Sequence, residues 1–300
     1  MNRKALKVSK TSIFLSMYKA GHRILNGTGI GRFYPIRVVD NLLSGSIDYE
    51  NPIQLSSHKL FLGPKSTVSK QIIWSGSYEP FETELVKKEV KKGDIVLDLG
   101  ANFGYYTLIL ADTVGDAGKV YAFEPDPFNF ALLKKNVQIN GYSNVTLVQK
   151  AVSNKTGQAI LHISDEDLGG HSIHEQRYCS RTIEVETIRL DDYFSDQRSR
   201  IDFIKMDIEG AEFEAIEGMP LLLQRNNKLK IVTEFYPQVI KESGRNILDL
   251  PSILLAHGFK LYDINDQQNM MRPLDMSSLS AMSARLLQNA SPTNLFCVRQ

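Results

Sequence analysis

Ile95-Val96-Leu97-Asp98-Leu99-Gly100-Ala101-Asn102-Phe103-Gly104 is the stretch of sequence that decides the fold. Ile95 to Leu99 form a short apolar run, which is typical of a strand covered on both faces of a sheet. A helical pattern follows from Tyr105 to about Thr113, and Gly100 and Gly104 keep the turn between them free of large side chains. In an open parallel sheet, ligands bind at the carboxyl ends of the strands, where this turn lies.

The rest of the chain continues to alternate between strands and helices. We expect further strands at Lys119 to Glu124, Val145 to Gln149, Phe203 to Met206, Lys230 to Phe235, Phe259 to Asp263 and Leu295 to Val298, and helices from Pro80, Phe128 to Ile139, from about Phe213, and Leu250 to His257. This order predicts an α/β fold of the Rossmann-like kind, with a seven-stranded, mostly parallel sheet and helices on both faces.

Two segments depart from the alternation. Residues 1–77 are predicted to be an accessory or cap region, with a basic helical start and β-like pieces near Gln54 to Leu62 and Val68 to Trp74. Residues 78–300 then form the Rossmann-like domain. Within it, residues at about 157–190 alternate polar and apolar side chains around a polar loop, which predicts a β-rich, hairpin-like insertion.

Composition narrows the class of protein. Among 300 residues, 35 lysines and arginines nearly balance 34 aspartates and glutamates, and no basic stripe is interleaved with aromatic residues, so we expect no nucleic-acid partner. The two cysteines form no CxxC pair, as in a reducing, cytoplasmic protein. No apolar run approaches the ~20 residues of a transmembrane helix, although the basic N-terminus leaves a weak membrane-surface contact open.

The turn after the first strand indicates which cofactor binds there. A dinucleotide site would carry GxGxxG, but here Asp98 stands ahead of the first glycine and Asn102 lies between Gly100 and Gly104. A carboxylate repels a pyrophosphate and suits a cationic amino-acid ligand, so we expect S-adenosylmethionine, which carries an ammonium and a sulfonium. Glu124 ends the second strand, where an acid can accept hydrogen bonds from both ribose hydroxyls.

Three motifs together resemble the FkbM family of S-adenosylmethionine-dependent methyltransferases. They are Gly93 to Thr107, which contains GANxGxYT, then Phe123-Glu124-Pro125, and Ile204 to Glu212, which contains KxDxEGxE. The resemblance covers about residues 76–264, and it implies the class I methyltransferase fold and, for most members of known activity, methylation of hydroxyl groups on glycan sugars and complex natural products. The first 75 residues match no motif that we can name.

The resemblance also assigns roles to individual residues. It implies that Asp98, Gly100, Asn102 and Gly104 form the loop on the methionine side, that Glu124 holds the ribose, that Ala151 and Val152 lie near the adenine, and that Asp207 faces the methyl donor.

Methylation of a neutral hydroxyl benefits from a general base. Asp207 and Glu209 follow a predicted strand at the edge where chemistry is expected, and side chains two residues apart on a strand share a face. His171 on the inserted loop is a third catalytic candidate, with His174 and Glu234 as weaker ones. The His-x-x-His spacing on a single polar loop offers too few ligands, so we expect no metal.

Motifs that the chain lacks narrow the chemical class of the methyl acceptor. Asp207-Ile208-Glu209-Gly210 is neither the Asn- or Asp-Pro-Pro-aromatic turn of amino-directed nucleic-acid methyltransferases nor a Pro-Cys nucleophile, which favours oxygen methylation of a small-molecule or glycan acceptor. Two alternatives stay open: an NAD(P)-dependent oxidoreductase or sugar epimerase, which would need GxGxxG and a Tyr-x-x-x-Lys pair that the chain lacks, and a non-catalytic scaffold.

Overall fold

The computed structural model describes residues 48–299 apart from 165–166, 168–169, 175–178 and 197–199. The predicted basic helix near the N-terminus, and the membrane-surface contact left open for it, lie outside these residues. None of the helices described is both long and apolar enough to cross a membrane.

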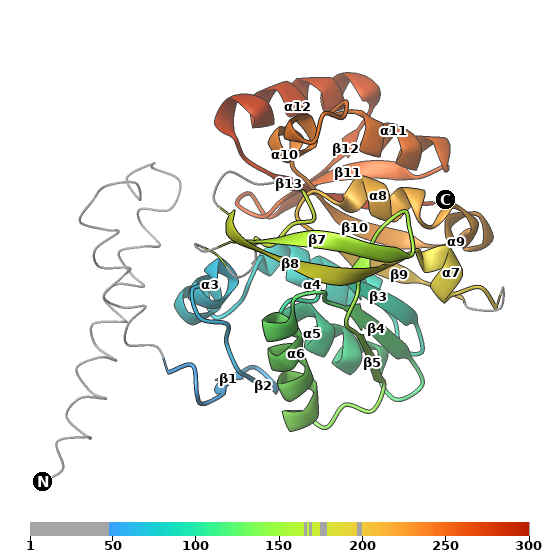
Figure 1. Ribbon diagram of the computed structural model, residues 1–300. Helices are drawn as coiled ribbons and strands as arrows, with labels where there is room; N and C mark the ends of the chain where they lie inside the picture. The colour runs from blue at the N-terminus through green and yellow to red at the C-terminus, as the bar shows by residue number, and fades with distance from the viewer. Residues whose placement is uncertain (1–47, 165–166, 168–169, 175–178, 197–199, 300) are drawn as a thin grey trace, which may run out of the picture.

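A mixed sheet runs through the centre of the molecule (Figure 1). Across the described residues its order is β12-β11-β13-β10-β9-β3-β4-β5. The strands are β3 (Ile95–Leu99), β4 (Lys119–Phe123), β5 (Val145–Val148), β9 (Phe203–Met206), β10 (Lys230–Phe235), β11 (Lys260–Asn265), β12 (Met270–Leu274) and β13 (Thr293–Val298). The five strands from β10 to β5 are parallel, and β13 is antiparallel to both of its neighbours. The predicted fold is confirmed, and β12 adds an eighth strand at the edge.

Helices cover both faces of this sheet. They are α3 (Thr67–Ser75), α4 (Pro80–Glu89), α5 (Tyr105–Val114), α6 (Pro127–Ile139), α7 (Leu190–Tyr193), α8 (Glu212–Glu217), α9 (Pro220–Arg225), α10 (Pro237–Glu242), α11 (Asp249–Ala256) and α12 (Met276–Asn289). Alternate residues of β3 enter opposite cores: Leu97 and Leu99 pack with α8, α9, α11 and α12, whereas Val96 packs with α3 to α6. An apolar strand with both faces covered is what the opening sequence run predicted.

The strand order places the functional edge of the sheet. From β3 the chain continues outward to β4 and β5, and then crosses to the other side of β3 to form β9. The sheet therefore reverses its order between β3 and β9, and the loops after these two strands border a crevice at their carboxyl ends.

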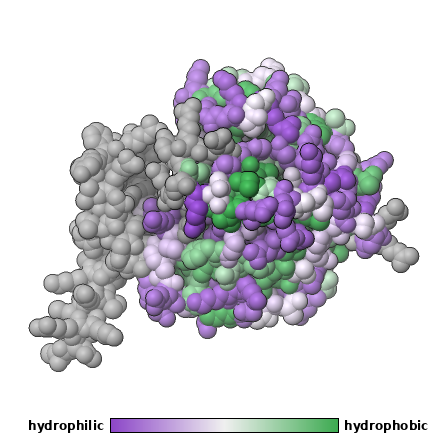
Figure 2. Space-filling model, viewed as in Figure 1, coloured by the Kyte–Doolittle hydropathy of each residue, from purple (hydrophilic) through white to green (hydrophobic). Residues whose placement is uncertain are grey.

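A smaller sheet lies beside that edge. It joins β6 (Ala151–Val152), β8 (Cys179–Ile188) and β7 (Gly157–Ser164), with β7 and β8 antiparallel within the inserted segment. Figure 2 shows hydrophobic atoms gathered over these strands and over α6, with hydrophilic atoms around them; Ile160 of β7 and Phe128 of α6 are exposed. The polar loop between β7 and β8 approaches the crevice, as the contacts below show.

Residues 48–77 pack onto the larger domain. The β-like pattern near Gln54 to Leu62 gives β1 (Ile53–Leu55) and β2 (His58–Leu60), but Val68 to Trp74, expected to be β-like, lies in helix α3. The capping of α3 explains why the predicted strand is a helix. Ser66 accepts a hydrogen bond from the backbone N–H of Ser69, and Gly76 ends the helix in the left-handed conformation. These caps outweigh the strand preference of the β-branched residues between them.

Candidate functional site

A cavity of about 300 Å³ opens at the carboxyl ends of β3, β4 and β9. It brings together most residues that the sequence predicted for the site, namely Asp98, Gly100, Asn102, Glu124, Ala151, Val152, His171, Asp207 and Glu209. Thr67 and Val68 of α3 also line it, so the segment before residue 78 contributes to its wall.

The two glycines of the β3 turn are required by packing. A Cβ on Gly100, whose φ is +81°, would lie 1.9 Å from the carbonyl oxygen of Asp207, so only glycine lets the β3 and β9 loops touch. A Cβ on Gly104, whose φ is +98°, would meet Leu133 of α6 at 2.7 Å. Gly104 faces α6 and is not among the residues that line the cavity, so its contact with the cofactor stays a prediction.

Asp98 lies at the end of β3 and is 2% exposed. Its Oδ2 accepts a hydrogen bond from the Thr107 hydroxyl of α5, and burial raises its pKa to about 6. A carboxyl group in a nearly dry wall of the cavity favours a cationic group of the ligand, which would restore its charge.

Glu124 is held rigidly after β4. Its Oε2 accepts the backbone N–H of Asn102 at 2.7 Å, and its Oε1 accepts the N–H of Asp126 at 2.9 Å. Burial raises the pKa of Glu124 to about 8, against these two hydrogen bonds. Each oxygen keeps a further lone pair that can accept a hydroxyl, and the contact of Glu124 with the ribose stays a prediction.

Apolar and acidic residues occupy different parts of the cavity wall. Ala151 packs with Leu161 in a small buried cluster of the inserted sheet, and both line the cavity. This apolar surface suits an aromatic base, Glu124 suits a ribose, and the carboxyl groups of Asp98 and Asp207 suit the positive charges of a sulfonium amino acid. The residues present therefore fit S-adenosylmethionine.

The comparison with protein families decides between the alternatives left open above. Residues 98–261, more than half of the chain, match the methyltransferase FkbM domain. The chain belongs to the FkbM methyltransferase family. Its cofactor is S-adenosylmethionine, as expected, and the nicotinamide-dependent alternative is set aside.

Individual relatives agree with this membership. The chain is similar to methyltransferase sdnD of Sordaria araneosa, with 29% identity over 41% of this chain and 60% of the relative. It is also similar to the hexuronic acid methyltransferase AglP of Haloferax volcanii, with 26% identity over 48% of this chain and 57% of the relative. The matched part thus spans about three fifths of each relative. Among solved structures, the FkbM methyltransferase of Methylobacillus flagellatus KT is 15% identical, with a TM-score of 0.45, over 90% of this chain and 60% of that one.

The KxDxEGxE motif of this family carries a buried charge network. Lys205 of β9 is 1% exposed, and its Nζ lies 3.2 Å from Glu82 Oε1 and 3.5 Å from Asp207 Oδ2. The same ammonium sits over the ring of Tyr106 at 4.9 Å. Burial opposes the charge of Lys205, but the carboxylates of Glu82 and Asp207 outweigh it and raise its pKa. Lys205 thereby holds in place the carboxylate of Asp207, which lines the cavity.

The start of α4 supplies two further acids that sequence reasoning missed. The Tyr106 hydroxyl lies 3.0 Å from Glu82 Oε1 and 3.2 Å from Glu79 Oε2, and Asn294 of β13 donates to Glu79 Oε1 at 2.9 Å. Burial and then the neighbouring Glu82 raise the pKa of Glu79 well above its ordinary value. Glu79 also has a φ of +41°, an uncommon conformation for a residue other than glycine.

Glu209 and Glu234 line the cavity together with Asp207. Burial, and then the carboxylate of Asp207, raise the pKa of Glu209 well above its usual range, and burial does the same for Glu234. Glu234 Oε2 is buried and has no hydrogen-bond partner among the residues that the structure describes. Together with Tyr78, these three acids line both the cofactor cavity and a second cavity of about 530 Å³.

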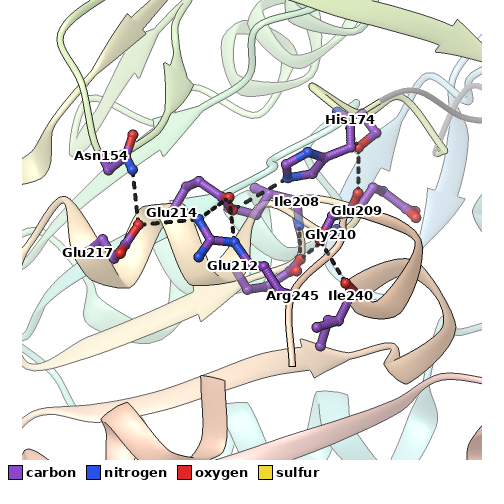
Figure 3. A network of polar contacts seen from close by, with 12 residues as sticks. Asn154, His174, Ile208, Glu209, Gly210, Glu212, Glu214, Glu217, Ile240 and Arg245 are labelled. Carbon is purple, nitrogen blue, oxygen red and sulfur yellow. Dashed lines mark hydrogen bonds and ion pairs between the residues drawn. The ribbon is translucent and has the colours of Figure 1, made fainter. Parts of the chain in front are cut away.

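A polar network holds the turn that carries Glu209 (Figure 3). Glu212 Oε1 accepts the backbone N–H groups of Ile208 at 3.0 Å and Gly210 at 3.3 Å, so the last glutamate of the motif caps the turn. The Glu214 carboxylate forms an ion pair with the Arg245 guanidinium at 2.8 Å. It also lies 3.4 Å from His174 Nε2. This contact gives His174 a structural partner, so it is a poor candidate for the base.

His171 lines the cavity, and a backbone hydrogen bond determines which of its ring nitrogens carries the hydrogen. Its Nδ1 accepts the backbone N–H of Ser164 at 3.1 Å, so the neutral ring carries its hydrogen on Nε2. A ring nitrogen that already bears hydrogen cannot accept a proton from a substrate. This contact disfavours His171 as a base; its catalytic role stays a prediction, and a different role is developed below.

We predict that Glu124→Gln weakens the binding of S-adenosylhomocysteine by about tenfold to a hundredfold, because a hydrogen bond to a charged acceptor is lost. Below pH 8, the ligand must displace the proton of wild-type Glu124. The affinity of the wild-type protein for S-adenosylhomocysteine should therefore fall by up to about tenfold for each unit by which the pH is lowered. Calorimetric titration between pH 6 and 8 measures both effects, with exposed Glu84→Gln as the control. Binding to wild type that does not change with pH would remove this role from Glu124.

Proposed function

We propose that this protein transfers the methyl group of S-adenosylmethionine to a hydroxyl oxygen of an uncharged, sugar-like acceptor. The observation that carries the proposal is the junction of two cavities at Asp207, Glu209 and Glu234. The first cavity fits the cofactor, the second has room for an acceptor, and the acids between them lie where the methyl group would cross.

The bound cofactor supplies a methyl group that is already activated by the positive sulfur. The acceptor oxygen forms a bond to the methyl carbon while the carbon–sulfur bond breaks, and the hydroxyl proton passes to a carboxylate of this chain. Asp207 is the base in our proposal, since Lys205 at 3.5 Å stabilises its negative charge. Burial raises the pKa of both Glu209 and Glu234, which favours the protonated forms that can donate hydrogen bonds to the acceptor.

The second cavity has the chemistry of a carbohydrate site. Its wall is rich in polar side chains, including Glu79, Asp263, Asp266, Gln267, Gln268, Asn289, Ser291, Thr293 and Asn294. Such groups can pair with several hydroxyls of one sugar. Arg285 is the cationic residue in the described lining and is exposed, so an acceptor carboxylate would meet mainly acids. The hexuronic acid relative supports the carbohydrate class, while this charge distribution favours a neutral sugar.

The test supplies methyl-labelled S-adenosylmethionine with matched pools of neutral glycosides and the corresponding uronic acids. We expect label in the neutral pool at a rate at least about tenfold higher, because like-charge contact raises the barrier for the acid. Label in the uronic acids alone would overturn the neutral class but keep oxygen methylation. Label in neither pool, with transfer to RNA or to an amine, would overturn the proposed function.

Two further expectations belong to this proposal. The near-zero net charge still favours a partner other than nucleic acid. Within the described residues Cys179 and Cys297 form no disulfide, which is in keeping with the proposed cytoplasmic location. A non-catalytic scaffold would have no use for the buried Lys205 beside Asp207, and the turnover measurement in the Discussion tests that alternative.

A further inference from the structure

The inserted loop carries a histidine, His171, that lines the cofactor cavity. Ser164 N donates to His171 Nδ1 at 3.1 Å, which places the hydrogen of the neutral ring on Nε2. Burial lowers the pKa of His171, so the ring stays neutral at physiological pH. The histidine thus has a defined tautomer, set by a backbone contact of its own loop.

The Nε2 atom of His171 is buried and has no partner within the described part of the chain. A buried donor without an acceptor is destabilising, so its position calls for an explanation. His171 lines the cofactor cavity, and the groups that act on its charge are Asp126, Asp167 and Arg181. The orphaned donor therefore belongs to the wall of the cofactor cavity.

His171 lies toward the apolar end of this cavity. Ser164, its backbone partner, directly follows Ile163, and Ile163 packs in one cluster with Leu161 and Ala151. Ala151 and Leu161 line the same cavity and offer the surface that suits an aromatic base. Asp207, at the methyl-transfer end, is not among the groups that shift the pKa of His171.

We infer that His171 Nε2–H recognises the adenine of S-adenosylmethionine by donating to one of its ring nitrogens. The ring nitrogens N1, N3 and N7 of adenine are acceptors, and a single donor in an apolar wall selects one of them. His171 is thus a specificity-determining residue of the cofactor site. The neighbouring Ser172 hydroxyl donates to the Glu209 carbonyl at 2.6 Å, so the loop that contacts adenine also holds the catalytic turn.

The inference rests on the cofactor of the proposed function, and its test uses binding alone. Calorimetry with S-adenosylhomocysteine should show about a tenfold loss of affinity for His171→Phe and a smaller loss for His171→Gln, which keeps an N–H donor. His162→Phe is the matched control, because His162 alternates with Leu161 and Ile163 on β7 and does not line the cavity. Melting temperatures check that each variant folds.

Deaza analogues of the ligand identify the acceptor atom. Of the 1-deaza, 3-deaza and 7-deaza forms of S-adenosylhomocysteine, one should bind wild type about tenfold more weakly, and His171→Phe should remove that difference. Equal binding of all three to wild type, or a loss confined to 2′-deoxy or 3′-deoxy analogues, would overturn the inference. Failure of wild type to bind S-adenosylhomocysteine would instead overturn the proposed function. Failure of sugar methylation leaves this result intact.

Discussion

Asp207→Asn should lower the turnover number by about 10² to 10⁴, the usual contribution of a positioned general base. The amide keeps the size of the side chain but cannot take the acceptor proton. The affinity for S-adenosylhomocysteine should change by less than about threefold, because this product lacks the positive sulfur that the carboxylate faces. Single-turnover kinetics with labelled cofactor, beside calorimetry of the same variant, measure the two effects separately.

Glu209→Gln is the matched control for that experiment. Glu209 adjoins the same two cavities, but burial raises its pKa well above its usual range and favours the protonated form, so its amide variant should lose far less turnover. If Asp207→Asn keeps normal turnover and Glu209→Gln does not, the base is Glu209. If neither variant loses turnover, the chemistry lies elsewhere, and a scaffold function regains support.

Lys205→Met should destabilise the folded protein by about 3–5 kcal/mol, the usual cost of removing one partner of a buried ion pair. Lys205 is 1% exposed and Glu82 is 0% exposed, so the carboxylate of Glu82 would be left in a dry core. Denaturant unfolding measures the loss, and the melting temperature should fall by roughly 10 °C. Adding Glu82→Gln to the variant should restore much of the stability, because the orphaned charge is then removed.

Lys230→Met provides the comparison for a surface pair. Lys230 lies on the neighbouring strand β10 and pairs with Glu89 of the same helix α4 at 2.9 Å, but both side chains are partly exposed. Its loss should cost at most about 1 kcal/mol. Equal stability losses for Lys205→Met and Lys230→Met would show that the buried network contributes no more than an exposed ion pair.

Local sequence patterns predicted the central elements well, because each strand is short, apolar and ended by a turn signal. They were less informative where a segment is exposed or capped by single side chains. β12 is largely exposed and has no apolar alternation, so the seven-stranded prediction lacked it. α12 carried a usable signal that was overlooked, since Asp275 and Ser278 form a capping box ahead of buried Leu279 and Met282.

The residues of the site also fall into those that local sequence patterns predicted and those that only the tertiary structure revealed. Asp98, Glu124 and Asp207 were predictable because each acid follows a recognisable strand, and the strands of a parallel sheet end at one edge. Glu79 and Glu82 carried no comparable signal. They lie more than a hundred residues before Lys205, and only the packing of α4 beside β9 brings them to the network. The sequence singled out His171, but its tautomer could not be predicted, because it depends on the contact with Ser164.

The stretch from Ile95 to Gly104 by itself determined the fold and the class of cofactor, because hydrophobic periodicity, the glycine turn and the charge of Asp98 are local properties. The tertiary structure decided why Gly100 is a glycine, since the contact is with the distant carbonyl of Asp207. It also decided which acids have raised pKa values, and which nitrogen of the neutral His171 ring carries the hydrogen. Burial and hydrogen-bond partners set these properties, and both arise only when segments far apart in the chain pack together.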